Sequence, residues 1–270
     1  MSTLTDLRKR LRGVRTICQL AGAMRTASSA KLARLSSVSA AYAAYASACR
    51  DLLAAAGIQP PPEADKRTLM ILLSGNRGLC GNYHNELFSY FRSLLEPEGQ
   101  VYITCGAMAA SYCRERGIPL LAEYAVSDVP DYSQGEALAD RVLELYGSRE
   151  VSRVCLVYGE AVNALIQQPR CVELLPGEEA GKAEDALWFP DLPTARAWLL
   201  DFCLRAEIYS LLLKAAQGVQ GATLVSMRSA YDNGNKSAAA LETAINRMRQ
   251  SQVTAGVIET SSGLLPGEEG

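Results

Sequence analysis

Hydrophobic residues recur in alternating steps of three and four along the first fifty residues of the chain. The series contains Leu4, Leu7, Leu11, Val14, Cys18 and Ala21, and then Leu32, Leu35, Val38, Tyr42, Tyr45, Cys49 and Leu52. This spacing is typical of a coiled-coil seam. Thr3 and Asp6 have the spacing of a capping box, and Gly57 and the prolines at 60–62 end the pattern. A helix over residues 1–57 would be about 80 Å long, so we expect it to need a partner helix.

A second long hydrophobic series occupies the other end of the chain. From Asp191 onward a helical period predicts a helix over residues 191–260, about 100 Å long, and a tail over 261–270. Asn233 and Gly234 could instead form a turn that divides this helix. Two long terminal helices that flank a domain most simply pair antiparallel, and the heptad spacing implies left-handed winding.

Between these helices, short apolar runs alternate with amphipathic segments over residues 68–176. The predicted strands are Thr68–Leu73, Val101–Cys105, Leu120–Tyr124 and Arg153–Tyr158, and the predicted helices are Asn82–Leu95, Met108–Arg116 and Glu136–Tyr146. This alternation indicates a small, doubly wound parallel sheet. The segment from Pro176 to Pro190 is predicted to be a loop. The expected fold class is therefore α/β, with an antiparallel left-handed coiled coil of the terminal helices and a central Rossmann-like domain.

The net charge of -2 conceals a strong polarity along the chain. Residues 1–50 carry nine Arg or Lys residues against one acidic residue, whereas residues 51–193 carry 11 basic and 21 acidic residues. This polarity indicates an acidic partner for the first segment. No run of 18 apolar residues occurs, and no apolar block precedes a cleavage site. We therefore predict neither a membrane-spanning helix nor a secretory signal, and we expect the chain to stay in the cytosol.

Residues that could carry catalysis are sparse. Gly75, Gly78 and Gly81 follow the first strand, but their GxxGxxG spacing differs from the GxGxxG of dinucleotide sites, so we interpret them as a tight turn. His84 is the single histidine, and the eight cysteines lack zinc-site spacing, so we interpret them as buried hydrophobic residues. Cys80 is read as packing at the turn. We expect no cofactor, no metal and no active site, which favours a structural or transmitting role.

Three segments have distinctive sequences: LRKRLRGVRTICQLAGAMRTASSAKL at 7–32, SGNRGLCGN at 74–82 and MRSAYDNGNKSAAALETAINRMRQSQVTAGVIE at 227–259. Together they resemble the gamma subunit of the F-type ATP synthase. The chain departs from the family pattern at Gln19, Ala21, Asn76, Gly218, Val219, Thr223 and Gly256. The resemblance thus implies a divergent member of the family.

The resemblance implies a central-stalk rotor that couples ion flow through a membrane c-ring to ATP synthesis or hydrolysis in a ring of three alpha and three beta subunits. It implies no catalytic site on this chain, a contact with the epsilon subunit, and a peripheral position at the cytoplasmic face of the cell membrane. The implied contacts with the alpha/beta ring are Arg8, Lys9, Arg10, Arg12, Arg15, Met24, Arg25, Lys31, Asn246, Arg249, Gln250, Thr254, Val257 and Ile258.

Two hypotheses give these residues their roles. The basic residues of the first helix would face acidic levers of the ring, and Arg249 and Gln250 would hydrogen-bond a ring loop. Val253, Val257 and Ile258 would form an apolar shaft end that turns in a sleeve. The competing interpretations are a solvated helix face for the charges and an ordinary seam for the apolar residues.

Two other classes of function compete with the rotor. A basic helical arm could attach the sheet domain to nucleic acid through phosphate contacts, although the chain has few aromatic residues to stack on bases. A dehydrogenase built on the central sheet would need a dinucleotide site, which the glycine spacing disfavours.

Overall fold

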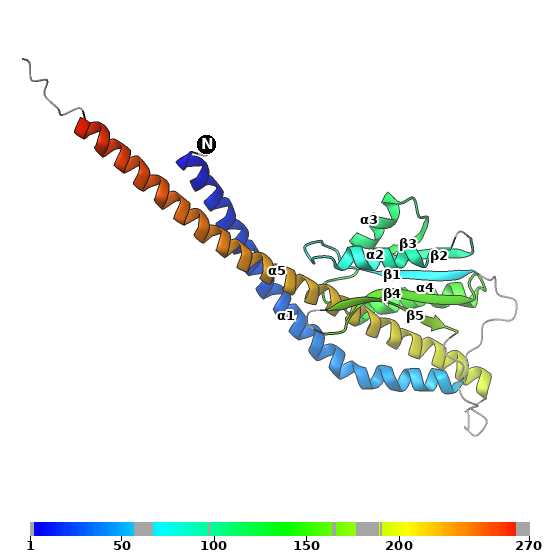
Figure 1. Cartoon of the computed structure of the whole chain (residues 1–270). Coiled ribbons are helices and arrows are strands. Elements are labelled where there is room, and N and C mark those ends of the chain that lie inside the picture. Colours follow the sequence, from blue (N-terminus) through cyan, green and yellow to red (C-terminus); the bar gives the residue numbers. More distant parts are fainter. Residues whose placement is uncertain are drawn as a thin grey trace, which may run out of the picture. The chain divides into compact units, whose positions relative to one another are not determined.

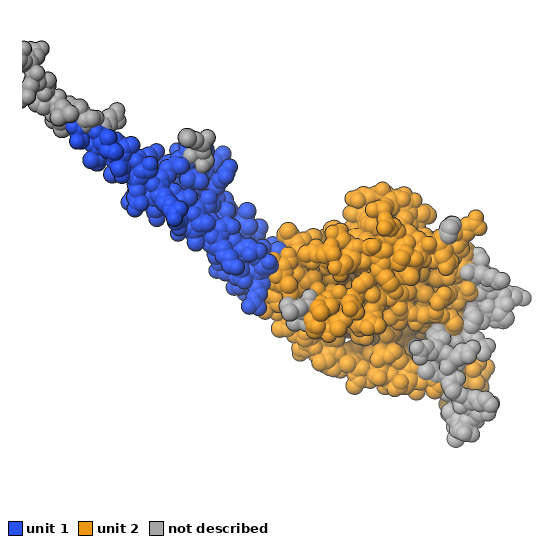
Figure 2. Space-filling model, in the orientation of Figure 1, with its two compact units in different colours: residues 1–26, 227–270 blue, residues 27–226 orange. Residues whose placement is uncertain are grey.

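The computed structural model describes residues 3–56, 67–96, 98–163, 166–176, 189 and 191–262. The predicted helix end at Gly57 and 60–62, most of the predicted loop before Pro190, and all but the first two residues of the predicted tail lie outside this described part. The chain divides into two compact units: unit 1 comprises residues 1–26 and 227–270, and unit 2 comprises residues 27–226 (Figure 2).

Two long helices run through both units. Helix α1 spans Leu4–Ala56 and α5 spans Leu192–Ser262. The start of α1 is the predicted capping box: the Asp6 amide donates to Thr3 Oγ1 at 3.2 Å, and the Thr3 amide donates to the Asp6 carboxylate at 3.1 Å. Each helix therefore begins where its sequence signal predicts.

Helix α5 is continuous through Asn233 and Gly234, so the alternative of a turn at these residues is wrong. The glycine has a packing reason. A Cβ atom built at Gly234 would lie 2.4 Å from Cys18 Sγ of α1. Gly234 therefore lets the two helices approach closely, although glycine costs about 1 kcal/mol relative to alanine inside a helix.

In unit 1 the two helices pair antiparallel. The Arg15 guanidinium lies 2.7 Å from the Glu242 carboxylate, and Cys18 lies against Gly234. Further along α1, Gly22 lies against the Tyr231 ring. Residue numbers thus rise on α1 as they fall on α5. The buried residues of unit 1 are mostly small or flexible ones: Leu7, Cys18, Ala21, Met227 and Ala238.

In unit 2 the same two helices also pair antiparallel, but the seam differs from the prediction. Tyr45 and Leu52 are exposed, whereas Ala46 and Ala56 are buried. A straight α-helix has 3.6 residues per turn, so the buried face drifts by about 20° per heptad relative to a strict seven-residue repeat. The predicted apolar positions Trp198 and Phe202 of α5 are likewise exposed, and their neighbours Cys203, Leu204 and Ala206 are buried.

Unit 2 contains a five-stranded sheet with the order β3-β2-β1-β4-β5 (Figure 1). Its strands are β1 (Thr68–Leu73), β2 (Gln100–Cys105), β3 (Leu120–Tyr124), β4 (Arg153–Ala161) and β5 (Gln167–Leu175). The first four strands are parallel to one another, as predicted, and β5 pairs antiparallel with β4.

The sequence did not predict β5. It contains Pro169, which lacks the amide proton that an interior strand needs, and most of its residues are half-exposed or exposed. Both features fit its position at the edge of the sheet, where one side of the backbone has no strand partner. They also weaken the sequence pattern of a strand.

Helices cover both faces of the sheet, which confirms the doubly wound arrangement. Figure 1 shows α2 (Tyr83–Ser93) and α3 (Ala107–Glu115) on one face and α4 (Tyr132–Gly147) on the other. One core joins α4 and the residues 204–215 of α5 to the sheet, and the second core joins α2 and α3 to its opposite face.

Helix α5 passes very close to the sheet at Gly218. A Cβ atom at this position would lie 2.3 Å from the Gly159 carbonyl oxygen at the end of β4. Beyond this point Val219 and Ala222 contribute to the second core. The glycine therefore allows α5 to cross the carboxyl edge of the sheet.

Candidate partner-contact surface

The residues that the sequence assigns to partner contacts lie on α1 and α5. All of them except Lys31 belong to unit 1. Most are exposed: Arg8, Lys9, Arg10, Arg12, Arg15, Asn246, Arg249, Gln250, Thr254, Val257 and Ile258. Met24, Arg25 and Lys31 are half-buried. The structure thus leaves most of the predicted contact residues accessible to a partner.

The basic start of α1 is exposed and carries little internal pairing. Within the part of the chain that the structure describes, Arg8, Lys9, Arg10 and Arg12 form no ion pair. Arg15 pairs with Glu242, but both side chains are about half-exposed or more, and such surface pairs contribute at most about 1 kcal/mol. This segment therefore presents positive charge to its surroundings.

Besides Arg15, two more of the predicted contact residues have side-chain partners on another element. The Arg25 guanidinium lies 4.7 Å from the centroid of the Tyr231 ring, a cation–π geometry. The Lys31 ammonium pairs with the Asp128 carboxylate, which follows β3. These contacts give both residues a role in packing, which the sequence did not indicate.

The far end of α5 is exposed on all sides. Every residue from 249 to 258 is exposed, including the aliphatic residues Val253, Val257 and Ile258, which are 60%, 60% and 62% exposed. Helix α1 runs antiparallel to α5 and begins only at Leu4, so it does not cover these last turns of α5. We name Val253, Val257 and Ile258 the apolar end. Adjacent exposed aliphatic residues of this kind are typical of an interaction site.

A second exposed apolar pair was missed by the sequence reasoning. Ile17 and Leu20 of α1 are 59% and 58% exposed. They lie beside the seam positions Cys18 and Ala21, which are buried against α5. The sequence contained a signal for this pair, because bulky aliphatic residues lie outside the heptad seam here while small residues occupy the seam positions.

The glycine loop after β1 is fastened by the single histidine. The Gly75 amide donates to His84 Nε2 at 3.3 Å, so the ring proton lies on Nδ1, which is 3.0 Å from Cys80 Sγ. Burial lowers the pKa of His84 to about 4, so the ring is neutral, and burial raises the pKa of Cys80. The pair therefore holds the loop on α2, and burial acts against ionisation of the thiol.

The loop itself fits a tight turn. Gly81 has a φ of 61°, a left-handed conformation that glycine adopts without strain. A Cβ at Gly75 would lie 2.9 Å from a methyl group of Val219. These contacts agree with the interpretation of the glycines as a turn with close packing.

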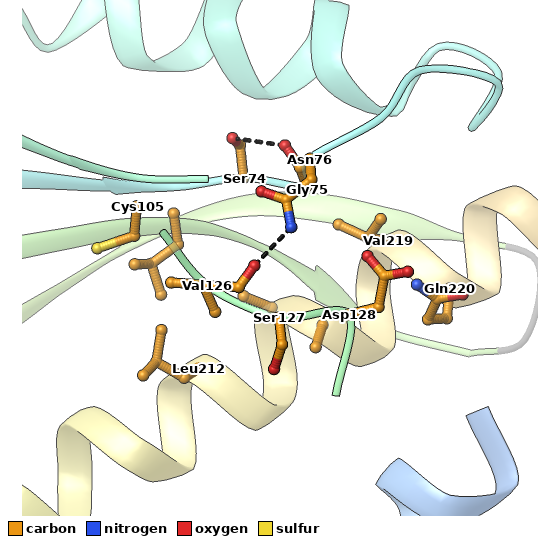
Figure 3. A pocket seen from close by; sticks show the side chains of 13 residues that line it. Ser74, Gly75, Asn76, Cys105, Val126, Ser127, Asp128, Leu212, Val219 and Gln220 are labelled. Atoms are coloured by element: carbon orange, nitrogen blue, oxygen red, sulfur yellow. Dashed lines mark hydrogen bonds between the residues drawn. The ribbon is translucent and has the colours of Figure 1, made fainter. Parts of the chain in front are cut away.

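A small cavity lies at the carboxyl ends of β1 and β2 (Figure 3). Its volume is about 20 Å³, and its lining includes Ser74, Asn76, Ser127 and Gln220. A space of this size holds about one water molecule. It has no room for a dinucleotide, so the edge of the sheet that such a cofactor would use is filled by the protein's own side chains.

Asn76 organises this edge of the sheet. Its amide nitrogen donates to the Val126 carbonyl, as Figure 3 shows, and its amide oxygen accepts from the Ala107 amide at 3.1 Å. The side chain therefore joins the loop after β1 both to the start of α3 and to the segment after β3. Each bond uses one of the two different polar groups of the amide.

A larger hollow of about 390 Å³ lies between α2 and α3. Its aromatic side chains stack on one another, because the centroids of the Phe88 and Tyr112 rings lie 4.4 Å apart. The Arg116 guanidinium lies over the Tyr112 ring, 5.3 Å from its centroid. The His84 ring stacks on the Phe88 ring and extends the same aromatic stack. The faces of these rings are therefore occupied within the chain.

Comparison with known proteins places this architecture in a family. The family model described as ATP synthase matches residues 3–265. The chain belongs to the ATP synthase family. Its relatives include the ATP synthase gamma chain of Desulfitobacterium hafniense, which is 28% identical and aligns over 97% of this chain and 98% of the relative. The gamma chain of Chlorobaculum tepidum is 29% identical with the same coverage. The chain is thus a divergent member of the gamma type.

Solved structures of the same fold come from mitochondrial ATP synthases. A chain of the OSCP/F1/c-ring structure of Euglena gracilis in rotational state 3 matches with a TM-score of 0.68 at 16% identity, covering 99% of this chain and 98% of that one. A chain of the central stalk and c-ring of Tetrahymena thermophila matches with a TM-score of 0.63 at 18% identity, covering 78% and 99%. None of these comparisons supports a nucleic-acid-binding arm.

No helix within the described residues is long and apolar enough to span a lipid bilayer.

Proposed function

We propose that this chain is the central-stalk rotor subunit of an F-type ATP synthase. It couples ion flow through the membrane c-ring to ATP synthesis or hydrolysis at a ring of three alpha and three beta subunits. The observation that carries the proposal is the match of residues 3–265 to the ATP synthase family, on a chain whose two long helices form an antiparallel pair.

The coupling follows from asymmetry. One shaft cannot present the same face to three equivalent catalytic subunits, so it favours a different conformation in each. A contact shifts a conformational equilibrium only when its free energy differs between the conformations. As the shaft turns, the same set of contacts passes from one subunit to the next. The ATP chemistry itself belongs to the beta subunits, and this chain has no catalytic role.

The exposed residues on the two helices supply those contacts. The exposed basic segment at Arg8–Arg12 faces acidic groups of the ring, and Arg249 and Gln250 hydrogen-bond one ring loop. The apolar end turns in a sleeve of the ring, which shields its aliphatic side chains from water. Met24, Asn246 and Thr254 lie on the same helices and complete the contact surface.

The sheet domain, residues 68–176, serves as the foot. It meets the epsilon subunit and the c-ring, and the terminal segments 1–57 and 191–260 act as the shaft. The chain is held at the cytoplasmic face of the cell membrane through the c-ring. Its acidic composition over residues 51–193 contrasts with the basic start of α1, which fits two surfaces with different partners.

The first test is whether the chain purifies with an ATP-hydrolysing alpha/beta hexamer. The second replaces Arg249 and Gln250 together by Ala in the assembled complex and measures ATP hydrolysis and ion pumping in the same vesicles. We expect at least a tenfold loss of pumping per ATP hydrolysed. Arg228→Ala, at an exposed position on the same helix, serves as the control. Wild-type coupling in the double variant would refute the contact assignment, and absence of the hexamer would refute the function.

A further inference from the structure

Buried polar side chains lie on both long helices close to the boundary between the two units. Unit 2 spans residues 27–226. Near its two ends, Ser28 of α1 is 5% exposed, and Gln220 and Thr223 of α5 are 6% and 8% exposed. The Thr223 hydroxyl donates to a carbonyl of its own helix. The side-chain amide of Gln220, in contrast, has no hydrogen-bond partner among the residues that the structure describes, and a buried amide normally has one.

Gln220 faces a space of the right size for one water molecule. Together with Ser127 and Asp128, it lines the cavity of about 20 Å³ at the carboxyl ends of β1 and β2 (Figure 3). Buried water molecules occupy cavities that are polar and about one probe sphere in size, and they bond polar groups that have no other partner. This cavity meets both conditions, so a water molecule in it would complete the hydrogen bonding of Gln220.

The segment 126–130, which follows β3, connects this cavity to both long helices. The Asp128 carboxylate forms an ion pair with the Lys31 ammonium of α1, and the two side chains are 25% and 35% exposed. The Tyr209 hydroxyl of α5 donates to the Pro130 carbonyl at 3.5 Å. Asp128 therefore lies where α1, α5 and the sheet domain meet.

We propose that the cavity binds one ordered water molecule, and that Lys31, Asp128 and Gln220 together with this water fix the register of α1 on α5. The water accepts a hydrogen bond from the Gln220 amide and donates one to the Asp128 carboxylate, which also pairs with the Lys31 ammonium. We call these three residues and the water the register cluster. Through it, the segment after β3 holds both helices at one axial position.

Polar groups specify a register where apolar groups do not. An apolar seam tolerates sliding of one helix along the other, because one aliphatic contact resembles the next, whereas a buried polar group must meet its partner. Sliding α1 by one turn, about 5 Å, would break the ion pair between Lys31 and Asp128. Sliding α5 would carry the Gln220 amide away from the cavity. The register cluster therefore disfavours the displaced arrangements.

A close contact in unit 1 offers a competing explanation for the register. Gly234 of α5 fits against Cys18 of α1, where a Cβ atom would lie 2.4 Å from the sulfur. Substitutions in the register cluster leave this contact unchanged. The two explanations therefore differ in what they predict when the cluster is replaced by uncharged or apolar residues of similar size.

The test variant combines Lys31→Met, Asp128→Asn and Gln220→Leu, which removes both charges and the buried amide. Replacing buried polar groups together by apolar groups of similar size is often neutral or stabilising, so the unfolding temperature should not fall. The register should nevertheless become mixed, an effect that an ordinary stabilising contact does not produce. The matched control combines Lys236→Met, Asp232→Asn and Gln217→Leu, which lie on α5 outside the cavity lining and the ion pair.

The measurement is the distance between two nitroxide labels on the full-length chain, by pulsed electron paramagnetic resonance. The labels are attached to p-acetylphenylalanine at the exposed positions Gln19 and Arg247, so the eight native cysteines stay unlabelled. These positions are offset along the helix pair, so sliding by one turn changes their distance by up to about 5 Å. We expect one narrow distribution in the wild type and the control, and two distances in the test variant.

A single distance in the test variant would overturn the register role and assign it to the contact between Gly234 and Cys18. An unfolding temperature more than about 5 °C below that of the control would make the three residues ordinary stabilising contacts, which also overturns the proposal. Separately, a high-resolution crystal structure of the wild type should show one water molecule bonded to Gln220 and Asp128, and a dry cavity would refute the water site. All three measurements use the chain alone, so their outcome does not depend on the rotor function.

Discussion

At the scale of single residues, three positions that depart from the resemblance have clear local contacts. The Asn76 amide both donates and accepts, which a carboxylate cannot do. Val219 packs against Gly75 in the second core. The Thr223 hydroxyl donates to the Val219 carbonyl at 2.8 Å.

Asn76→Asp should destabilise the chain by about 1–3 kcal/mol, because a carboxylate oxygen would face the Val126 carbonyl in place of a donor. The comparison is urea unfolding at pH 7 against Asn235→Asp, an exposed position on α5. The carbonyl favours the protonated acid and so raises the pKa of the new carboxyl in the folded state. The loss should therefore shrink as the pH falls toward 4, and an equal loss at pH 7 and pH 4 would contradict this account.

His84 should make the chain lose stability on acidification. Its folded pKa of about 4 is below the ordinary value of 6.5 because the ring is buried. The unfolded chain therefore binds the proton more readily between these values, and the stability that is fully present above about pH 6.5 is lost as the pH falls toward 4. The loss amounts to about 3 kcal/mol at most.

His84→Gln removes the titrating group and keeps a hydrogen-bonding side chain beside Gly75. The difference in unfolding free energy between wild type and variant should depend on pH in the window from 4 to 6.5 and be constant above it. A difference that stays constant from pH 4 to pH 8 would mean that the ring titrates equally in both states.

At the scale of elements, the sequence predicted the types of nearly all segments and the bounds of several. Strands β1 and β3 match their predicted bounds, because each is a short apolar or alternating run between turn residues. Helix α4 begins four residues before its predicted start, at a capping box of Asp131 and Gln134 that the apolar period did not include. Strand β5 escaped prediction because an edge strand need not be apolar. Its register on β4 comes from tertiary contacts.

Gly218 should be the least replaceable glycine of α5. Gly218→Ala places a methyl group 2.3 Å from the Gly159 carbonyl oxygen, a backbone atom that cannot rotate away, and should cost about 2–4 kcal/mol. Gly221→Ala is the matched control one turn later, where the nearest atom is a side-chain nitrogen at 3.4 Å. Urea unfolding measures both. Equal effects of the two changes would show that α5 does not depend on its close approach to β4.

At the scale of the whole molecule, the sequence predicted the antiparallel helices from their heptads and the central sheet from its alternation. It could not predict how the seam drifts, because the seven-residue pattern contains no information on helix twist. Tyr45 therefore stands outside and Ala46 inside. The predicted contact residues are mostly exposed, but the sequence segments that carry the resemblance do not by themselves predict which side chains are exposed. Arg25 and Lys31 show this, since both bind within the chain.

Replacing the apolar end by serine, as Val253→Ser with Val257→Ser and Ile258→Ser, should leave the unfolding temperature of the isolated chain within about 1 °C, because these side chains are already exposed. In the assembled complex we expect ion pumping per ATP hydrolysed to fall severalfold. The matched control replaces Cys18, Ala21 and Ala238 by serine, which should lower the unfolding temperature. Unchanged pumping in the first variant would remove the sleeve from the mechanism.

The apolar end also has a consequence for the life of the chain before assembly. Three aliphatic side chains, each about 60% exposed, follow one another within six residues at the end of α5. A copy without its ring offers the kind of surface that promotes aggregation and that chaperones and proteases recognise. The side chains that would seat the shaft in its ring would thus also make an unassembled copy more prone to aggregation and proteolysis than an assembled one.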